Sequence, residues 1–178
     1  MNNNIVLIGF MGCGKTTVGQ ELAQRLNYKF LDTDQYIEEK EGTTIRNIFS
    51  EKGEVYFRNL ETSTLKELVE ETRESVVSSG GGLPLRQENA KLLQKLGFVI
   101  YLKVSKDTVV ERLKGDTTRP LLQGDNPAKK VEELLCFRDP IYEVGAHMAI
   151  SVDNKTVEEI ADEIIRNYET MQHKNKED

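Results

Sequence analysis

The residues best suited to chemistry lie near the N-terminus, where positions 9–16 read GFMGCGKT. They fill every position of the phosphate-binding pattern G-x-x-x-x-G-K-[ST] and directly follow an apolar run at residues 5–8. In this pattern the glycines let backbone N–H groups converge on phosphates, and the next helix directs its positive end at them. Lys15 is expected to reach the β- and γ-phosphates and Thr16 to bind Mg²⁺. The alternative is a glycine-rich turn that binds nothing, but the apolar run before the motif and the amphipathic stretch after it favour a nucleoside triphosphate site.

An aspartate pair, Asp32 and Asp34, stands at the end of the second predicted strand, residues 29–32. Ligands bind at the carboxyl ends of the strands in an open α/β sheet, so both carboxylates are expected to face the phosphate loop. Alternation along a strand predicts that they point to the same side, one toward the hydration shell of Mg²⁺ and the other toward an attacking hydroxyl. The structural alternative is a helix N-cap, for which aspartate is also common.

Arg58 and Glu61 lie three residues apart in a predicted helix and therefore face the same way. One interpretation is a surface ion pair, which stabilises a helix by only a few tenths of a kcal/mol. The other is that Glu61 orients a guanidinium group whose two-pronged edge binds a substrate carboxylate. The spacing alone does not choose between them.

Three consecutive glycines, residues 80–82, follow the third predicted strand and a pair of serines. Because such a run is costly in backbone entropy, it favours a sharp turn that brings main-chain N–H groups against a ligand over a flexible strand exit. No acidic residue ends this strand. Asp32 is therefore the better candidate on the metal side.

Two further arginines stand beside prolines. Arg119 precedes Pro120 in a segment without periodicity, where a closing loop could bring it onto the transferred phosphoryl group, or where it could serve only solubility. Arg138, in the sequence RDPIY, is either a helix cap or a second anion clamp.

Short apolar runs that alternate with stretches of helical period must position these residues. The runs predict strands at residues 5–9, 29–32, 75–78, 98–104 and 148–152. The intervening pattern predicts helices at 15 to about 26 and at 156 to about 171, and a long polar helical region over 34–71. Residues 115–127 contain two prolines and two glycines and show neither a strand nor a helix pattern, so a loop is expected there. The alternation predicts a parallel sheet wrapped by helices.

The whole chain has 178 residues, which fits one domain. Its net charge is −6 and its basic residues are dispersed, so nucleic acid is not expected as a partner. One of its two cysteines lies inside the phosphate loop, so a structural disulfide is not expected and a reducing cytoplasm is favoured. No apolar run approaches the roughly 18 residues of a spanning helix, and the N-terminus lacks a basic leader, so neither membrane nor export is expected.

Six motifs in this order, GFMGCGKT, DTD, FRNLE, SGGG, RPLL and RDPIY, resemble the shikimate kinase family from residue 4 to about residue 165. The resemblance implies an α/β three-layer sandwich with a five-stranded parallel sheet, that is, a P-loop NTPase of the nucleoside-monophosphate-kinase type. It implies one kinase domain over residues 1–172, with a substrate-binding region at about 33–61, a lid at about 113–127 and a polar tail at 173–178. The implied reaction moves the γ-phosphoryl group of ATP, with one Mg²⁺, to the 3-hydroxyl of shikimate, on the route to chorismate and the aromatic amino acids.

The same resemblance assigns roles to individual residues. The implied catalytic residues are Lys15, Asp34 as the candidate base, and Arg119 as the lid arginine. The implied ATP contacts are Gly12, Cys13, Gly14, Lys15, Thr16, Thr17, Arg112, Arg119 and Lys155, the last beside Asn154. The implied shikimate contacts are Asp34, Arg58, Gly80, Gly81, Gly82 and Arg138, with Glu61 bracing Arg58 and with Phe49 and Phe57 either as pocket walls or as plain core. The implied metal contacts are Thr16 directly and Asp32 through water.

Two residues depart from the family pattern, because Met11 stands where proline is common and Cys13 where alanine or serine is commoner. Neither change removes a chemical group, so activity is expected to be retained. Cys13 is either a reactive thiol at the positive end of a helix or a small side chain tucked under the loop. Two other functions remain open, namely another small-molecule kinase of the same fold, such as a gluconate or nucleoside-monophosphate kinase, and a nucleotide-binding regulator. No large apolar interface is evident, so a monomer is expected.

Overall fold

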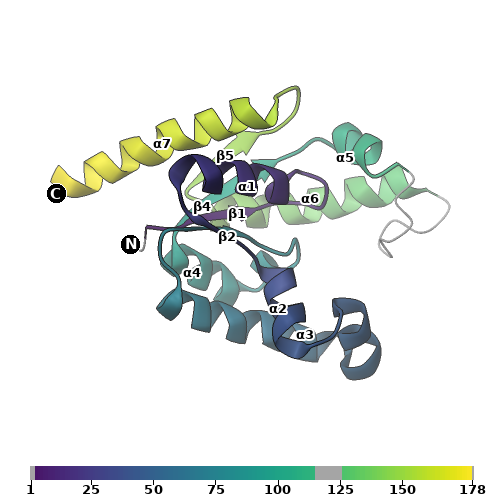
Figure 1. Cartoon of the computed structure of the whole chain (residues 1–178). Helices are drawn as coiled ribbons and strands as arrows, with labels where there is room; N and C mark the ends of the chain where they lie inside the picture. The colour runs from purple at the N-terminus through teal and green to yellow at the C-terminus, as the bar shows by residue number, and fades with distance from the viewer. Residues whose placement is uncertain (1–2, 115–125, 178) are drawn as a thin grey trace.

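The computed structural model describes residues 3–114 and 126–177, which form a parallel sheet with helices on both faces (Figure 1). Within these residues the sheet has five strands in the order β2-β3-β1-β4-β5, and every pairing is parallel. The strands are β1 (Ile5–Ile8), β2 (Lys29–Asp32), β3 (Ser75–Ser78), β4 (Phe98–Lys103) and β5 (Met148–Ser151). The predicted three-layer α/β architecture is confirmed.

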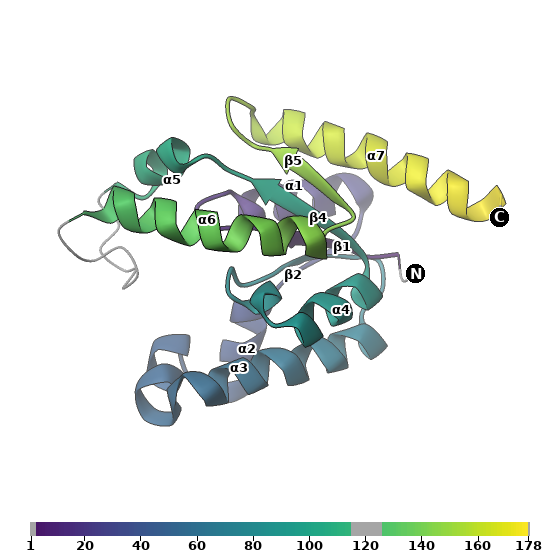
Figure 2. The ribbon, with the colours of Figure 1, turned by 180° about the vertical axis from the view of Figure 1, so that it is seen from behind.

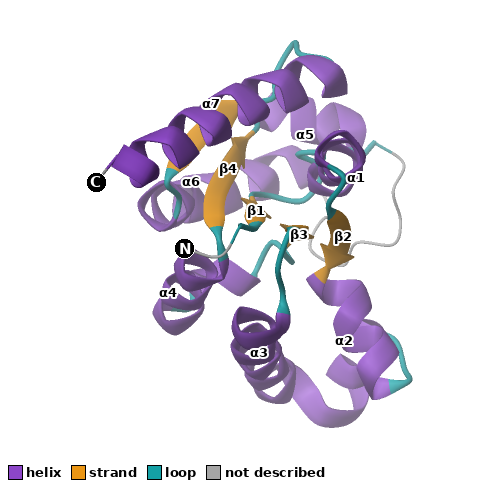
Figure 3. Ribbon diagram, turned by 60° about the vertical axis from the view of Figure 1, so that its left-hand side comes forward, coloured by secondary structure: helices purple, strands orange, loops and turns teal. Residues whose placement is uncertain are grey.

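The helices form the two outer layers. Helices α1 and α7 pack together on one face, while α4 and α6 cover the other and α3 packs against α4 and α2 (Figures 1 and 2). Figure 3 shows α2 and α3 as a helical region on the far side of the sheet from α7. The helix bounds are α1 (Lys15–Leu26), α2 (Thr33–Glu41), α3 (Ile45–Glu71), η1 (Leu83–Leu85), α4 (Gln87–Leu96), α5 (Lys106–Arg112), α6 (Pro127–Gly145) and α7 (Val157–Glu177).

The core lies on both faces of the central strands. Every residue of β1 and β3 is buried, and β4 is buried except for its last residue. Parallel strands covered on both faces are near-continuously apolar, as β1 is, and in β3 two buried serines flank two valines. The edge strands β2 and β5 are partly exposed.

The register of the sheet brings three strand ends together. Ser78 pairs with Asp32 on one side and with Leu7 on the other, and the next residue, Ser79, donates its backbone N–H to the Leu7 carbonyl at 3.0 Å. The segments that follow β1, β2 and β3 therefore begin at one edge of the sheet, and the phosphate loop, the aspartate pair and the glycine turn lie there.

The helical region differs from the sequence prediction in two places. The predicted stretch 34–71 is two helices, because Gly42 adopts a left-handed conformation (φ 66°) at the end of α2 and the Thr44 side chain caps α3. Within α3, Gly53 has non-helical angles (φ 80°, ψ 171°). The last helix continues to Glu177, beyond the expected end near Met171, because no glycine or proline stops it.

Most of the predicted lid, including Arg119, lies outside the described residues, and α6 begins at Pro127, where the predicted loop ends. Among the helices that the structure describes, none combines the length and apolarity needed to cross a membrane.

Candidate active site

The phosphate loop, residues 9–16, connects β1 to α1. Gly12 and Gly14 have φ angles of 75° and 96°. Residues with a Cβ atom rarely adopt this backbone conformation, so both positions require glycine. Gly14 is also the N-cap of α1 and supplies no side-chain bond to it. The first N–H groups of α1 therefore have no side-chain cap, which suits a helix end that binds an anion.

The Lys15 ammonium group lies over its own loop. Its Nζ donates to the Gly9 carbonyl at 2.8 Å and the Phe10 carbonyl at 3.0 Å. Thr16 and Thr17, in the first turn of α1, are exposed. The cation and both threonines thus lie beside the positive end of the helix, and their contacts to phosphate and Mg²⁺ stay predictions.

Cys13 is buried beneath this loop, with 1% of its surface exposed. Its Sγ lies 3.7 Å from the Lys15 Nζ, and a Cβ built on Gly9 would lie only 2.9 Å from the same sulfur. The geometry favours the alternative in which this position holds a small side chain tucked under the loop.

Arg112, at the end of α5, reaches the same loop and donates through Nη1 to the Gly12 carbonyl at 3.0 Å. Lys155 forms an ion pair with Glu163 of α7 at 2.6 Å, and its neighbour Asn154 adopts a left-handed turn (φ 58°). Their expected positions beside adenine stay predictions.

The aspartate pair does not follow the predicted strand alternation, because β2 ends at Asp32 and α2 begins at Thr33. Asp32 is the N-cap of α2: its Oδ1 accepts the backbone N–H groups of Asp34 at 3.0 Å and Gln35 at 3.3 Å. Asp34 is the second residue of that helix. Asp32 is therefore a helix N-cap, as the structural alternative predicted. The side chain of Asp34 is oriented by the first turn of α2 and not by the pleat of a strand.

Asp34 nevertheless faces the site and carries a perturbed carboxyl group. Burial, followed by the nearby charge of Asp32, raises its pKa from 3.8 to about 6, although Lys15 and Arg58 act in the opposite direction. The carboxyl lies against the glycine turn, since a Cβ built on Gly80 would be 2.5 Å from its Oδ1. A carboxyl with a pKa near 6 is suited to accept a proton close to neutral pH.

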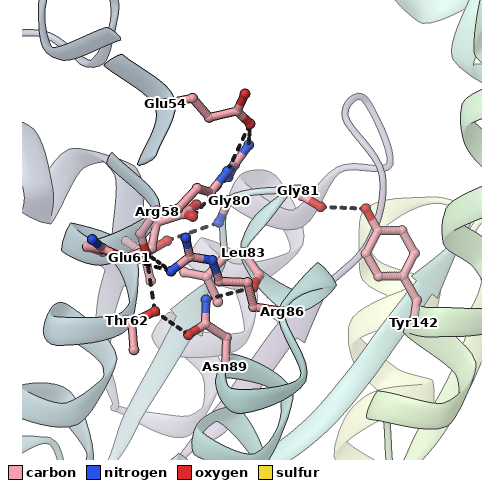
Figure 4. Close-up of polar contacts among 12 residues, drawn as sticks. Glu54, Arg58, Glu61, Thr62, Gly80, Gly81, Leu83, Arg86, Asn89 and Tyr142 are labelled. Atoms are coloured by element: carbon pink, nitrogen blue, oxygen red, sulfur yellow. Dashed lines mark hydrogen bonds and ion pairs between the residues drawn. The ribbon is translucent and has the colours of Figure 1, made fainter. Parts of the chain in front are cut away.

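Arg58 points toward the same turn from α3. Its Nη1 donates to Glu61 at 2.9 Å, and the Glu61 side chain is only 2% exposed (Figure 4). Burial raises the pKa of Glu61, while Arg58 opposes the rise. Glu61 is too deeply buried for the surface pair of the alternative interpretation, although the Arg58 side chain is 23% exposed. The other edge of the guanidinium, Nε and Nη2, lies 3.4 Å from Oε1 of the exposed Glu54.

A buried polar network that the sequence analysis missed holds α3 in place (Figure 4). The Thr62 hydroxyl donates to the Asn89 side chain at 2.8 Å, and Asn89 donates to the Leu83 carbonyl at 3.0 Å. Arg86 donates to the Arg58 carbonyl at 3.1 Å. These bonds connect the helix that carries Arg58 to the segment after the glycine turn. Polar residues on otherwise apolar helix faces, at Thr62 and Asn89, are the signal that could have indicated them.

The glycine turn lies between these groups and contacts the phosphate loop. Gly80 donates its N–H to the Thr33 hydroxyl at 3.0 Å, and a Cβ on Gly81 would lie 3.4 Å from the Gly9 carbonyl. A Cβ on Gly82 would lie 2.7 Å from the Arg58 guanidinium. None of the three glycines has a positive φ. Close neighbours, and not backbone strain, thus explain the lack of side chains at Gly80 and Gly82, whereas Gly81 has room for a Cβ at ordinary contact distance. These contacts favour the sharp turn over a flexible strand exit.

Arg138 approaches the turn from the opposite side, on α6. Its Nη1 would lie 3.9 Å from a Cβ on Gly81, and its guanidinium lies 5.5 Å from the centre of the Phe10 ring. The residue is 9% exposed, and its buried Nε has no hydrogen-bond partner among the described residues. Arg138 is not a cap, because α6 continues through Pro140. A buried cation with an unused donor is suited to bind an anion.

The two phenylalanines pack together, with ring centroids 4.8 Å apart. Phe57 is 4% exposed and belongs to a small core with Ile37 and Ile48, so it matches the plain-core alternative. Phe49 is 36% exposed.

The fold and this site define a P-loop kinase: a phosphate loop with its lysine contacts a glycine turn around which one carboxylate and two arginines lie. The comparisons with known proteins name its family. The family model for shikimate kinase matches residues 11–169. The chain belongs to the shikimate kinase family.

Individual relatives agree with that match. Shikimate kinase from Thermodesulfovibrio yellowstonii is 45% identical over 94% of this chain and 96% of its own length, and the enzyme from Sulfurihydrogenibium sp. is 47% identical over 91% and 95%. The solved structure of shikimate kinase from Acinetobacter baumannii in complex with shikimate superposes with a TM-score of 0.88 at 40% identity, covering 96% of this chain and 94% of that one. A gluconokinase from Sinorhizobium meliloti, 22% identical with a TM-score of 0.60, shares the fold alone.

Proposed function

We propose that this protein phosphorylates the 3-hydroxyl of shikimate with ATP, giving shikimate 3-phosphate and ADP on the route to chorismate and the aromatic amino acids. The observation that carries the proposal is the convergence of Asp34, Arg58 and Arg138 on one glycine turn that contacts the phosphate loop. Shikimate is a small carboxylate rich in hydroxyls, and this pocket offers cations for the carboxylate and a carboxylate for the hydroxyls.

Each side chain has a defined task in this reaction. Lys15 exchanges its loop carbonyls for phosphate oxygens, and its charge stabilises the transferred group. Asp34 accepts the proton of the attacking hydroxyl, while Arg58, braced by Glu61, and Arg138 hold the acid. The backbone N–H groups of residues 12–17 bind ATP phosphates, and Arg112 and Lys155 flank the nucleotide. Arg119, which lies outside the described residues, is proposed as the arginine of the lid at about 113–127.

The residues near the phosphate loop fit a Mg²⁺ that arrives with the nucleotide. Thr16 offers an exposed hydroxyl for direct binding, and Asp32 offers a carboxylate to the hydration shell, both hard oxygen donors. Within the described residues no group of three or more His, Cys, Asp or Glu could hold a metal by itself. Bound Mg²⁺ would neutralise charge on the β- and γ-phosphates.

We also propose that residues 33–61 form the substrate-binding region, that residues 1–172 act as one kinase domain, and that 173–178 is a tail without a role in catalysis. The negative net charge supports a protein without a nucleic-acid partner. We further propose a monomer that acts in the cytoplasm, which size-exclusion chromatography with light scattering and cell fractionation test.

A coupled ADP-release assay with MgATP tests the function, with shikimate, gluconate and nucleoside monophosphates offered separately as acceptors. The proposal expects turnover with shikimate only. Turnover with gluconate or a nucleotide, but not with shikimate, would identify the other kinase class. ATP hydrolysis that no acceptor accelerates would favour a nucleotide-binding regulator.

A further inference from the structure

The glycine turn offers two backbone donors that the folded chain does not use. The N–H of Gly80 is occupied by the Thr33 hydroxyl. The N–H groups of Gly81 and Gly82 donate no hydrogen bond within the described part of the chain. Free N–H groups beside two arginines are suited to a carboxylate, provided that their direction is fixed before the ligand arrives.

Bonds to the neighbouring carbonyls fix these directions. A peptide unit is planar, with its C=O and N–H on opposite edges, so a bond that holds one sets the direction of the other. The Leu83 N–H holds the Gly80 carbonyl at 3.1 Å and thereby orients the N–H of Gly81. The Tyr142 hydroxyl donates to the Gly81 carbonyl at 2.6 Å and thereby orients the N–H of Gly82 away from α6.

Burial and packing keep the Tyr142 hydroxyl on the Gly81 carbonyl. Its side chain is fully buried, and its ring packs against Tyr101 with centroids 5.2 Å apart. Burial raises the pKa of Tyr142 to about 12, so the hydroxyl remains a donor at any working pH. Figure 4 shows the side chain reaching from α6 to the Gly81 carbonyl. Tyr142 lies four residues after Arg138 on that helix, and the two therefore share a face.

From this geometry we infer that Tyr142 is a positioning residue for the acceptor carboxylate. It fixes the direction of the Gly82 N–H, away from α6, and separately ties the helix that carries Arg138 to the turn. Both groups thus keep the positions in which they can hold a carboxylate between them. The inference deepens the proposed function and rests on it. Arg58 needs no such help, because Glu61 of the same helix holds its guanidinium and the Thr62–Asn89 bond holds the helix itself.

The test compares Tyr142→Phe with Tyr101→Phe. Both variants lose one buried hydroxyl that donates at 2.6 Å, but the Tyr101 hydroxyl bonds to Asp139 and not to the turn. Isothermal titration measures shikimate and MgADP binding to each. Tyr142→Phe is expected to weaken shikimate binding about tenfold, or about 1.4 kcal/mol, with MgADP binding within about twofold of wild type. Its KM for shikimate should rise with little change in kcat, and Tyr101→Phe should leave both ligands within about twofold.

Three outcomes would overturn the inference. Equal shikimate affinities in the two variants would show that the turn needs no bond from Tyr142. A Tyr142→Phe protein that loses MgADP binding as well would make the residue a requirement of the whole fold. A wild-type protein that does not bind shikimate would overturn the proposed function and this inference with it, whereas the first two results leave the proposed function standing.

Discussion

Replacing Asp34 with asparagine should abolish phosphoryl transfer and yet stabilise the folded protein. Burial and Asp32 raise the pKa of this carboxyl from 3.8 to about 6, so ionising it costs more in the folded protein than in the unfolded chain. The rise corresponds to about 3 kcal/mol, since each pH unit is worth about 1.4 kcal/mol. The wild-type protein thus loses up to about 3 kcal/mol of stability as the pH rises from about 4 to above 6. Asparagine carries no charge and avoids this loss.

Urea denaturation of both proteins at pH 7.5 and pH 4.0 measures the effect. Asp34→Asn should be more stable by about 2–3 kcal/mol at pH 7.5, and the difference should shrink toward zero at pH 4.0. Titration of groups far from Asp34 cancels in the comparison. The matched control is Asp162→Asn, an exposed aspartate paired with Arg25, which should change stability by less than about 1 kcal/mol at either pH.

Activity gives the second half of the test. Asp34→Asn should bind ATP nearly as wild type does and show no turnover, while wild-type kcat/KM should fall as the pH drops below about 6. If Asp34→Asn were no more stable than wild type at pH 7.5, the reasoning that ionised Asp34 destabilises the folded protein would be refuted. Near-normal turnover of the same variant would refute its role as the base.

Three further variants test acceptor binding, and a thiol reagent tests the phosphate loop. Arg58→Ala and Arg138→Ala should each weaken shikimate binding about ten- to hundredfold with little effect on ATP, because each removes a charge-assisted bond of about 1.5–3 kcal/mol; unchanged titrations would return both arginines to a structural role. Glu54→Gln should tighten shikimate binding about two- to threefold, because the Glu54 carboxylate competes with substrate for Nε and Nη2 of Arg58. The effect is small because this exposed ion pair is worth only about 0.5 kcal/mol. Weaker shikimate binding by the variant would contradict this competition. A thiol-alkylating agent should label the exposed Cys136 and spare the buried Cys13, as peptide mass mapping can check, and rapid labelling of Cys13 would show that the loop opens.

Local patterns predicted the sheet and the phosphate loop because both depend on short-range rules. Buried parallel strands must be continuously apolar, and positive-φ positions such as Gly12 and Gly14 must be glycine. Asp34 was placed on the correct side by the wrong reasoning. An aspartate at a strand end serves equally as a helix cap, and Asp32 became one.

The remaining features depend on packing between distant segments. The spacing of three residues predicted that Arg58 and Glu61 face the same way. Their burial depends on how α3 packs in the fold, so the sequence did not indicate that Glu61 is buried. Tyr142 lies 61 residues from the carbonyl that it holds, and in sequence it resembles any apolar residue on a helix face. No propensity or period carries information about such a contact.

The tight packing around the glycine turn also limits how the acceptor specificity of this enzyme can evolve. An added methyl group at Gly80 or Gly82 would collide with Asp34 or Arg58, so those two positions can vary only together with the residues that bind substrate. At Gly81 the nearest atom would lie 3.4 Å away, and the backbone there is open to any L-residue. Of the three glycines, Gly81 is therefore the one through which single substitutions can narrow the pocket, and selection for a smaller acceptor is expected to act there first.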